Sequence, residues 1–403
     1  MNNFLKFLII FTMLFNSLFS TINIFDYNIN FYYIIIFITL FYIIYLSSQN
    51  KLKILFTKDI IIGISFYLFL INIGLFSLIN PLYINNKIGE ISILVSYLFL
   101  FIVLISNLNE KFMTRIFIFL YLIFNFLLIS SLFEIIFGYH FNVPNFMNVN
   151  DNPLKIDKFA TGFFYNPNNL SVVLLVLFMF TYSKFQSKLA KILQVLFLAY
   201  IFKVNDSTIC LVVLIAFILL INFKNIKNIY SKFLIISLAA SISYFIYILM
   251  DKYLFLFSNK LATEKSTTLN TRIYLIKNGL DLSKQNILGY GPGMFNKVYR
   301  GSIETGHVLD PHCLFIEILV NYGIIGLLIL LLFLFTVLKS AFELKRFNNQ
   351  YSSIAYLSIL IIPLFFVVST SMSFSIFWII MNLIIIINGK EKLIKKSRGN
   401  INA

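Results

Sequence analysis

The sequence predicts an all-α polytopic membrane protein with about twelve transmembrane helices and one large outer loop between spans 9 and 10. Hydrophobic residues make up 60% of the 403 residues and charged residues only 12%, a composition that soluble globular domains do not have. The apolar runs are continuous and about 17–25 residues long, which is the length of a membrane helix. A spanning chain must also satisfy its own backbone hydrogen bonds, as a helix does.

Each predicted span is an apolar run bounded by polar residues. The runs are residues 4–22, 31–47, 59–79, 90–107, 113–137, 167–183, 188–203, 207–222, 231–250, 312–338, 352–369 and 371–388. The first twenty residues lack the small-residue cleavage site of a signal peptide, so we interpret them as the first span.

The positions of the basic residues predict the orientation, because cytoplasmic segments of membrane proteins are enriched in Lys and Arg. If both termini are cytoplasmic, 20 of the 32 Lys and Arg residues lie in inside segments and only four in short outside segments. The other eight lie in the long polar loop, residues 251–311, where the rule has little force. This loop and the shorter loop 138–166 are therefore predicted to face outward.

The chain accordingly divides into helices 1–9 (residues 1–250), an extracytoplasmic loop with a short amphipathic helix (251–311), and helices 10–12 with a basic cytoplasmic tail (312–403). The net charge of +16 is explained by this topology, so we expect no nucleic acid as a partner. Two cysteines and three scattered histidines predict neither a disulfide framework nor a metal site.

The most informative motif ends the long loop, where Asp310-Pro311-His312 precedes an apolar run. Asp is a favoured N-cap and Pro a favoured first helical residue. The motif therefore predicts that the tenth span starts here, with His312 in its first turn. The positive end of the helix disfavours imidazolium and favours a bound phosphate. His312 would then be a neutral general base. The alternative is a histidine that merely sits among lipid headgroups.

Glu317 follows five residues after His312, inside the predicted span. A carboxylate inside a span is costly, roughly 2.5–3.5 kcal/mol at the centre on insertion scales and less near an end. Its presence therefore predicts a role in the site, and we assign it with His312 to the catalytic group. The alternative is that Glu317 pairs with an Arg or Lys of the loop.

Two arginines stand among the six lysines of the long loop, Arg272 and Arg300. A guanidinium suits bidentate contact with phosphate oxygens, although such arginines also bind lipid headgroups. Arg272 opens a short amphipathic segment, residues 270–286, predicted to lie on the bilayer surface. The following Gly289-Tyr290-Gly291-Pro292-Gly293 predicts a tight turn that returns the loop over the membrane.

The second outer loop also ends at a predicted helix start. Asn166 can cap this helix and Pro167 can begin it, with Asn168 in the first turn. Two outward helix N-termini close together would bind a diphosphate, so Asn166 and Asn168 are assigned to that site. Ordinary helix capping is the alternative. Glu134 lies near the outer end of the fifth span and either lines the site or forms a salt bridge.

Taken as a set, these motifs resemble the O-antigen ligase and polymerase family, which includes Wzy-type polymerases and teichuronic-acid polymerisation proteins. The resemblance is carried by Asn270-Thr271-Arg272, by residues 287–293, by Asp310-Pro311-His312 with Glu317, Gly323 and Gly326, and by Thr161-Gly162-Phe163 with residues 166–169.

The resemblance implies a metal-independent and cofactor-free glycosyltransferase in the bacterial cytoplasmic (inner) membrane. Its donor would be a glycan on undecaprenyl diphosphate, with Arg272 holding the diphosphate and His312 activating the acceptor. The favoured activity is an O-antigen or surface polysaccharide polymerase that joins repeat units. The alternatives are an O-antigen ligase that acts on the lipid A core of lipopolysaccharide or another acceptor, and a lipid-linked oligosaccharide flippase. A chain-length regulator and a flippase are the expected partner proteins.

One departure from the family pattern concerns the entry to the eighth span. Family members often have Ser-Arg there, whereas this chain has Asn205-Asp206-Ser207 and no arginine. Lys203 would supply the charge without a bidentate fork, or Arg300 would take that role. Cys313 also stands where relatives usually have Asn.

Overall fold

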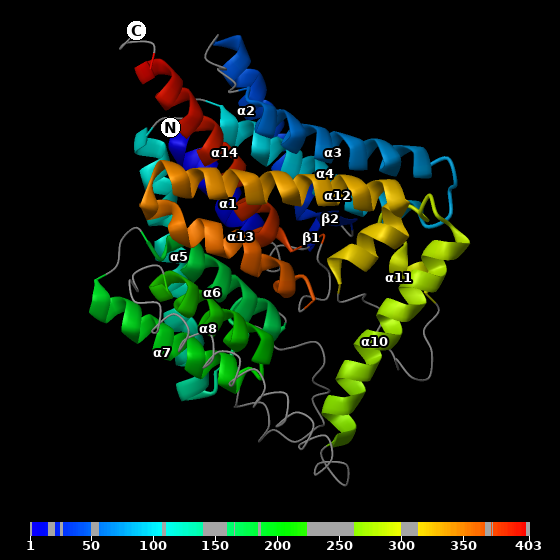
Figure 1. Cartoon of the computed structure of the whole chain (residues 1–403). Coiled ribbons are helices and arrows are strands. Elements are labelled where there is room, and N and C mark those ends of the chain that lie inside the picture. The colour runs from blue at the N-terminus through cyan, green and yellow to red at the C-terminus, as the bar shows by residue number, and fades with distance from the viewer. Residues whose placement is uncertain are drawn as a thin grey trace.

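The computed structural model describes most of the chain as a bundle of helices (Figure 1). The described residues are 2–14, 21–24, 27–49, 56–106, 110–139, 159–164, 166–183, 187–223, 262–299, 313–366, 372 and 374–399. The helices are α1 (Asn2–Leu14), α2 (Phe31–Ser48), α3 (Lys58–Ser77), α4 (Ile84–Ile105), α5 (Glu110–Phe137), α6 (Pro167–Thr181), α7 (Lys188–Val204), α8 (Thr208–Phe223), α10 (Ala262–Gln285), α11 (Phe295–Val298), α12 (Leu314–Phe347), α13 (Ser352–Leu364) and α14 (Ser375–Gly399), with a 3-10 turn, η3 (Asn349–Tyr351).

Eleven of the twelve predicted spans overlap a helix of the described part, and the run 231–250 lies outside the described residues. Four described helices are long and apolar enough to cross a membrane: Lys58–Ser77, Ile84–Ile105, Phe112–Phe137 and Leu314–Phe347. Others, such as α6 and α13, are apolar but shorter. The number of crossings therefore stays a prediction.

The end of the first predicted span needs correction. Helix α1 ends at Leu14, and the end of the predicted run forms strand β1 (Thr21–Ile24). This strand pairs antiparallel with β2 (Tyr27–Asn30), with Thr21 opposite Asn30. The polar residues Asn23, Asn28 and Asn30 interrupt the apolar pattern here, and Asn is a residue that favours turns over helix.

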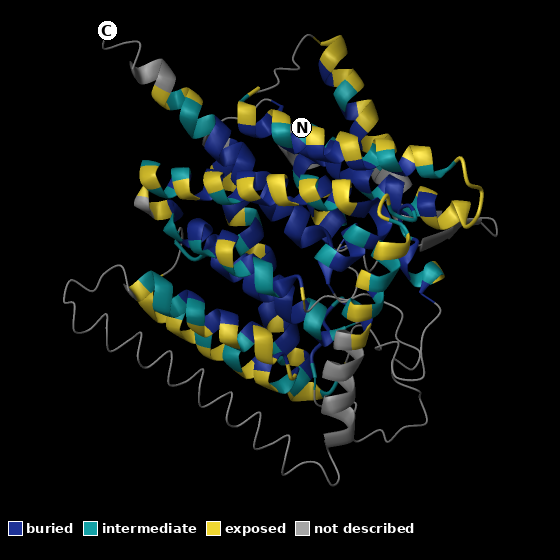
Figure 2. Ribbon diagram, turned by 45° about the vertical axis from the view of Figure 1, so that its right-hand side comes forward, coloured by how far each residue is buried: buried dark blue, intermediate teal, exposed yellow. Residues whose placement is uncertain are grey.

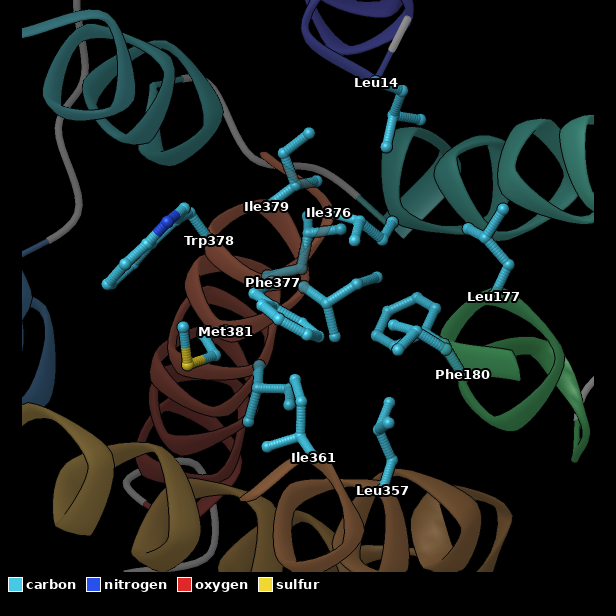
Figure 3. Packing of buried hydrophobic residues seen from close by; sticks show 14 of the residues in the cluster. Leu14, Leu177, Phe180, Leu357, Ile361, Ile376, Phe377, Trp378, Ile379 and Met381 are labelled. Carbon is cyan, nitrogen blue, oxygen red and sulfur yellow. The ribbon is translucent and has the colours of Figure 1, made fainter. Parts of the chain in front are cut away.

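The core of the bundle is organised around α14, whose residues from Ser375 to Ile387 are buried. Figure 3 shows Phe377 facing residues of α6 and α13, among them Phe180 and Ile361. On another side of α14, the ring of Trp378 packs on Phe66 of α3 with 5.7 Å between ring centroids. A helix segment that is apolar all round belongs inside a protein or a membrane, and this first part of α14 is inside, whereas Leu393 near its end is exposed.

The outside of the bundle is unusually apolar. Exposed large side chains line one face of several helices, for example Leu196 on α7, Ile129 on α5 and Phe335 on α12, which is 62% exposed. Figure 2 shows exposed residues recurring along α12 and along the helices at the lower edge of the bundle. Soluble proteins rarely expose apolar surface on this scale, so these faces are suited to contact lipid.

Hydrogen bonds between helix ends identify two opposite ends of the bundle. At the end that we call the loop end, Leu314 N of α12 donates to Phe365 O after α13, and Asn205 Nδ2 after α7 donates to Pro167 O at the start of α6. Figure 1 shows α10 at this side, away from the C-terminal part of α14.

The opposite end, which we call the basic end, carries an ion-pair network between α3, α12 and α14. Asp59 is buried and forms ion pairs with Lys392 at 2.5 Å and Lys339 at 3.5 Å, and Lys392 also pairs with Glu343 at 2.8 Å. Asn388 Nδ2 donates to Asp59 and Glu343. The network ties the start of α3 to the ends of α12 and α14.

Candidate functional site at the loop end

The loop end is built around a break in α12. At Gly323 the backbone leaves the helix, with φ 69° and ψ −171°. Residues 287–293, which we call the crossing segment, run along this break. Tyr290 N donates to Val320 O and Gly291 N to Asn321 O, both at 2.9 Å, and Ile324 N donates to Ile287 O at 3.0 Å. The crossing segment thus supplies the partners that the interrupted helix lacks.

Glycines permit this close approach of two backbones. A Cβ atom on Gly289 would lie 2.5 Å from Gly323 N, and one on Gly323 would lie 2.4 Å from Leu288 C. Both residues also have positive φ, +88° and +69°, a conformation that L side chains rarely adopt. The predicted tight turn at residues 289–293 is confirmed, and its partner is α12.

A buried carboxylate joins this junction to α4. The Tyr322 hydroxyl donates to Glu90 Oε1 at 2.9 Å, and the Gly293 backbone and the Asn321 side chain also hydrogen bond to Glu90. Asn321 Oδ1 in turn accepts from Phe295 N at 2.9 Å. Through these hydrogen bonds Glu90 connects α4, the crossing segment and α12.

The amphipathic helix predicted at 270–286 is present but begins earlier, since α10 spans Ala262–Gln285. Its second half packs on α12, where Gly279 lies close enough to Ile316 that an added Cβ would meet it at 2.3 Å. Asn278 Nδ2 donates to the Tyr299 hydroxyl at 3.3 Å. On the exposed side of α10, the hydrogen bond from Lys284 and its positive charge lower the pKa of Asp281.

A second polar cluster lies at the start of α6. Glu134 of α5 is fully buried, and its Oε2 accepts hydrogen bonds of 2.7 Å from the backbone N–H groups of Thr161 and Gly162. Asn166 caps α6 by accepting from Asn168 N at 2.8 Å, with Pro167 as the first helical residue. The predicted cap and helix start are confirmed, and Glu134 holds the segment that precedes them.

The turn between α7 and α8 completes this cluster. The Asn205 amide accepts from Ala160 N and donates to Pro167 O and Ser171 Oγ. Ser207 Oγ donates to Asn168 Oδ1 at 2.6 Å. The Asn205-Asp206-Ser207 sequence, where an arginine is missing, therefore fastens α8 to the α6 N-terminus. The Oδ1 atoms of Asn166 and Asn168 are engaged in these contacts, and their predicted binding of a diphosphate stays a prediction.

Of the two predicted catalytic residues, only Glu317 belongs to the described part of the chain. Glu317 is buried in the first turn of α12, whereas His312 lies outside the described residues. The predicted helix start was wrong: α12 begins at Leu314, with Cys313 as an extended N-cap, so His312 precedes the helix. The first free N–H, that of Leu314, finds its acceptor in Phe365 O and needs no capping side chain from Asp310.

Two of the three predicted cationic phosphate ligands lie in the described part of the chain, and their binding of a diphosphate stays a prediction. Arg272 is part of helix α10, and Lys203 is exposed in the last turn of α7. Arg300 lies outside the described residues. Among the described residues, no group of three His, Cys, Asp or Glu side chains is placed to hold a metal ion.

Sequence reasoning missed two charged residues of α4. In the sequence analysis, Glu90 was only the first residue of the predicted span 90–107. Lys87 was only one of the four basic residues in short outside segments. Lys87 is buried and its Nζ donates to Ser77 O at 2.8 Å and Asn80 O at 2.9 Å, after the end of α3. The available signal was their spacing of three residues on one helix face, next to an apolar run.

Comparison with known proteins finds a family model that is similar to part of the chain. Residues 172–331 match a family model described as O-Antigen ligase. The matched segment runs from α6 into α12 and includes the crossing segment and Gly323. No curated protein matches the chain. Together with the apolar helices, the match identifies a membrane protein.

Proposed function

We propose that this chain is a polymerase of surface polysaccharide that uses undecaprenyl-diphosphate-linked repeat units, because residues 172–331 match the O-antigen ligase family model. The family match is the observation that carries the proposal. The crossing segment adds support. This glycine-rich segment pairs with the break in α12 and so brings α10 close to the N-terminal part of α12.

The donor is bound through its diphosphate. Arg272 on α10 is our candidate for the bidentate contact, with Arg300 and Lys203 as further cations. Asn166 and Asn168 stand at the N-terminus of α6, where the helix dipole favours an anion. The long polyprenyl chain would lie along the apolar outer faces of the bundle, for example that of α12.

The chemistry is a displacement at the anomeric carbon of the donor glycan. The acceptor hydroxyl oxygen forms the new bond to this carbon, and the bond from the carbon to the diphosphate oxygen breaks. The hydroxyl proton passes to neutral His312, and undecaprenyl diphosphate leaves with the electron pair. Glu317 stabilises the histidine when it becomes charged, which is the usual role of a carboxylate beside a general base.

The proposed site faces outward from the bacterial inner membrane. The basic end carries Lys339 and Lys392, together with Lys345 and Arg346 in the last turn of α12. Under the positive-inside rule this end is cytoplasmic, as are both termini. The loop end then meets the donor on the outer leaflet.

Two other activities remain candidates. An O-antigen ligase would use the same donor with the lipid A core or another molecule as acceptor, and the family description names this activity. A flippase requires charged side chains along a path through the membrane. In the described part of the chain, the ion pairs lie at the basic end and on the exposed surface of α10 rather than along such a path.

The test uses a strain that lacks this chain and is complemented with variants. His312→Ala and Arg272→Ala should abolish the ladder of long glycans on a gel, while protein level and membrane insertion stay normal. Lys277→Ala, an exposed position on the same helix α10, is the matched control and should leave the ladder unchanged. A full ladder with both variants would overturn the enzymatic assignment.

Reconstitution distinguishes the three activities. Purified protein in lipid vesicles, given lipid-linked repeat units alone, should form a ladder of products if it is a polymerase. A ligase would form a single conjugate, and only when lipid A core is added. A flippase would move the lipid-linked unit across the bilayer without making any new glycosidic bond.

A further inference from the structure

We infer that Glu90 is a positioning residue of the loop-end site, which holds the crossing segment on the break of α12. The inference rests on the proposed function for its activity readout. Glu90 lies on α4, outside the segment that matches the family model, and was not among the residues expected to serve the site.

The first argument is the set of partners of the Glu90 carboxylate. It accepts from the Tyr322 hydroxyl on α12 at 2.9 Å and hydrogen bonds with the backbone of Gly293 in the crossing segment and the side chain of Asn321. In the described part of the chain, no lysine or arginine forms an ion pair with Glu90. The carboxylate therefore joins three donors from two other segments rather than balancing a cation.

The second argument is the lack of space around these donors. A Cβ atom added to Gly293 would lie 3.1 Å from Glu90 Oε2. Tyr322 is buried, with 1% of its surface exposed. Burying a carboxylate is costly unless hydrogen bonds compensate it. A residue chosen only for packing on α4 would be apolar here, as its neighbour Ile91 is.

The third argument is the position in the chain of the contact between Glu90 and the crossing segment, which we call the clamp. The crossing segment joins α10, which bears Arg272, to α11 and onward to the start of α12, which bears Glu317. Fixing the crossing segment therefore fixes the separation of the donor-binding helix from the proposed catalytic group. Small displacements of this kind change rates strongly, since a misplacement of about 1 Å can cost on the order of 100-fold.

The experiment compares Glu90→Gln and Glu90→Ala in purified full-length protein with lipid-linked repeat units as substrate. The glutamine is nearly the same size but presents an amide nitrogen to hydrogen-bond donors. Positioning predicts a fall in kcat by roughly 10- to 100-fold with KM for the donor within about twofold. Gly89→Ala, where an added Cβ meets nothing within 4 Å, is the control on the same helix and should match wild type.

A distance measurement separates this inference from the proposed function. Spin labels at Leu280→Cys on α10 and Leu328→Cys on α12, both exposed, are introduced after Cys210 and Cys313 are replaced by alanine. Glu90→Ala should broaden the distribution of distances between them, and Gly89→Ala should not. An unchanged distribution, or wild-type kcat in both Glu90 variants, would overturn the positioning role. If wild-type protein makes no glycan, the proposed function fails while the distances still test the clamp.

Discussion

The Tyr322 hydroxyl on α12 donates a 2.9 Å hydrogen bond to Glu90 on α4, a residue 232 positions earlier in the chain. Tyr322 immediately precedes Gly323, where α12 is broken. A bond between the second turn of α4 and the residue before the break holds the two halves of the chain together at the loop end. The stability of this end and the activity should therefore change together when the bond is removed.

Tyr322→Phe keeps the ring and removes the donor. Removing one partner of a buried hydrogen bond costs about 1–3 kcal/mol, and we expect the free energy of unfolding to fall by that amount. Thermal unfolding in detergent micelles measures it. Tyr200→Phe, at an exposed position of α7, is the matched control. Equal stability of the two variants would contradict the role of the Tyr322 hydroxyl.

Gly323→Ala should be among the most damaging single substitutions at the loop end. The added Cβ would lie 2.4 Å from the backbone of Leu288 at a residue with φ +69°, and such backbone strain alone costs about 1–3 kcal/mol. We expect a lower yield of folded protein and loss of the glycan ladder. Gly89→Ala should be tolerated, since an alanine is favoured over glycine inside a helix. A normal ladder with Gly323→Ala would show that the break is dispensable.

Glu134→Ala should release the segment before α6. It leaves the buried N–H groups of Thr161 and Gly162 without the Oε2 acceptor that they share, and each unsatisfied group costs about 1–3 kcal/mol. Glu134→Gln retains one side-chain oxygen and should lose less. We expect the unfolding temperature to be lowest for Glu134→Ala, higher for Glu134→Gln and highest for wild type, and thermal unfolding measures this order. If Ala and Gln behave alike, the two N–H groups have found other acceptors.

Substitutions at the basic end should reduce stability and leave catalysis intact. Lys392→Met removes two ion pairs of a buried Asp59 and a half-buried Glu343, whereas Lys339→Met removes one exposed contact of 3.5 Å. We expect a loss of about 1–3 kcal/mol for Lys392→Met and little for Lys339→Met. The glycan formed per folded molecule should equal that of wild type in both. A selective loss of activity would place the basic end in the reaction.

The helices were largely predictable because their apolar runs are long and bounded by polar residues. The cap at Asn166 and Pro167 also followed from local chemistry, since a capping side chain acts within its own turn. The break at Gly323 did not follow, because its cause lies in the crossing segment more than thirty residues earlier. A glycine within an apolar run does not reveal which segment approaches it.

The site was predictable only where one motif sufficed. Glu317 is buried at the start of α12 as its position suggested, but the start itself was misplaced, because Phe365 O of another helix accepts from Leu314 N. The Asn205-Asp206-Ser207 stretch was noted only for its lack of an arginine, whereas the Asn205 amide joins the segment before α6 to the first turn of α6. Both contacts arise from packing between helices, which spacing along the chain does not encode.

The pairing of residues 287–291 with residues 320–324 also bears on biogenesis. A broken helix that enters lipid alone would expose the Val320 and Asn321 carbonyls to a phase without hydrogen-bond donors. The segment that supplies those donors precedes α12 in the chain, so the ribosome has already made it when α12 is inserted. The interrupted helix can thus be completed during translation, before α13 and α14 exist.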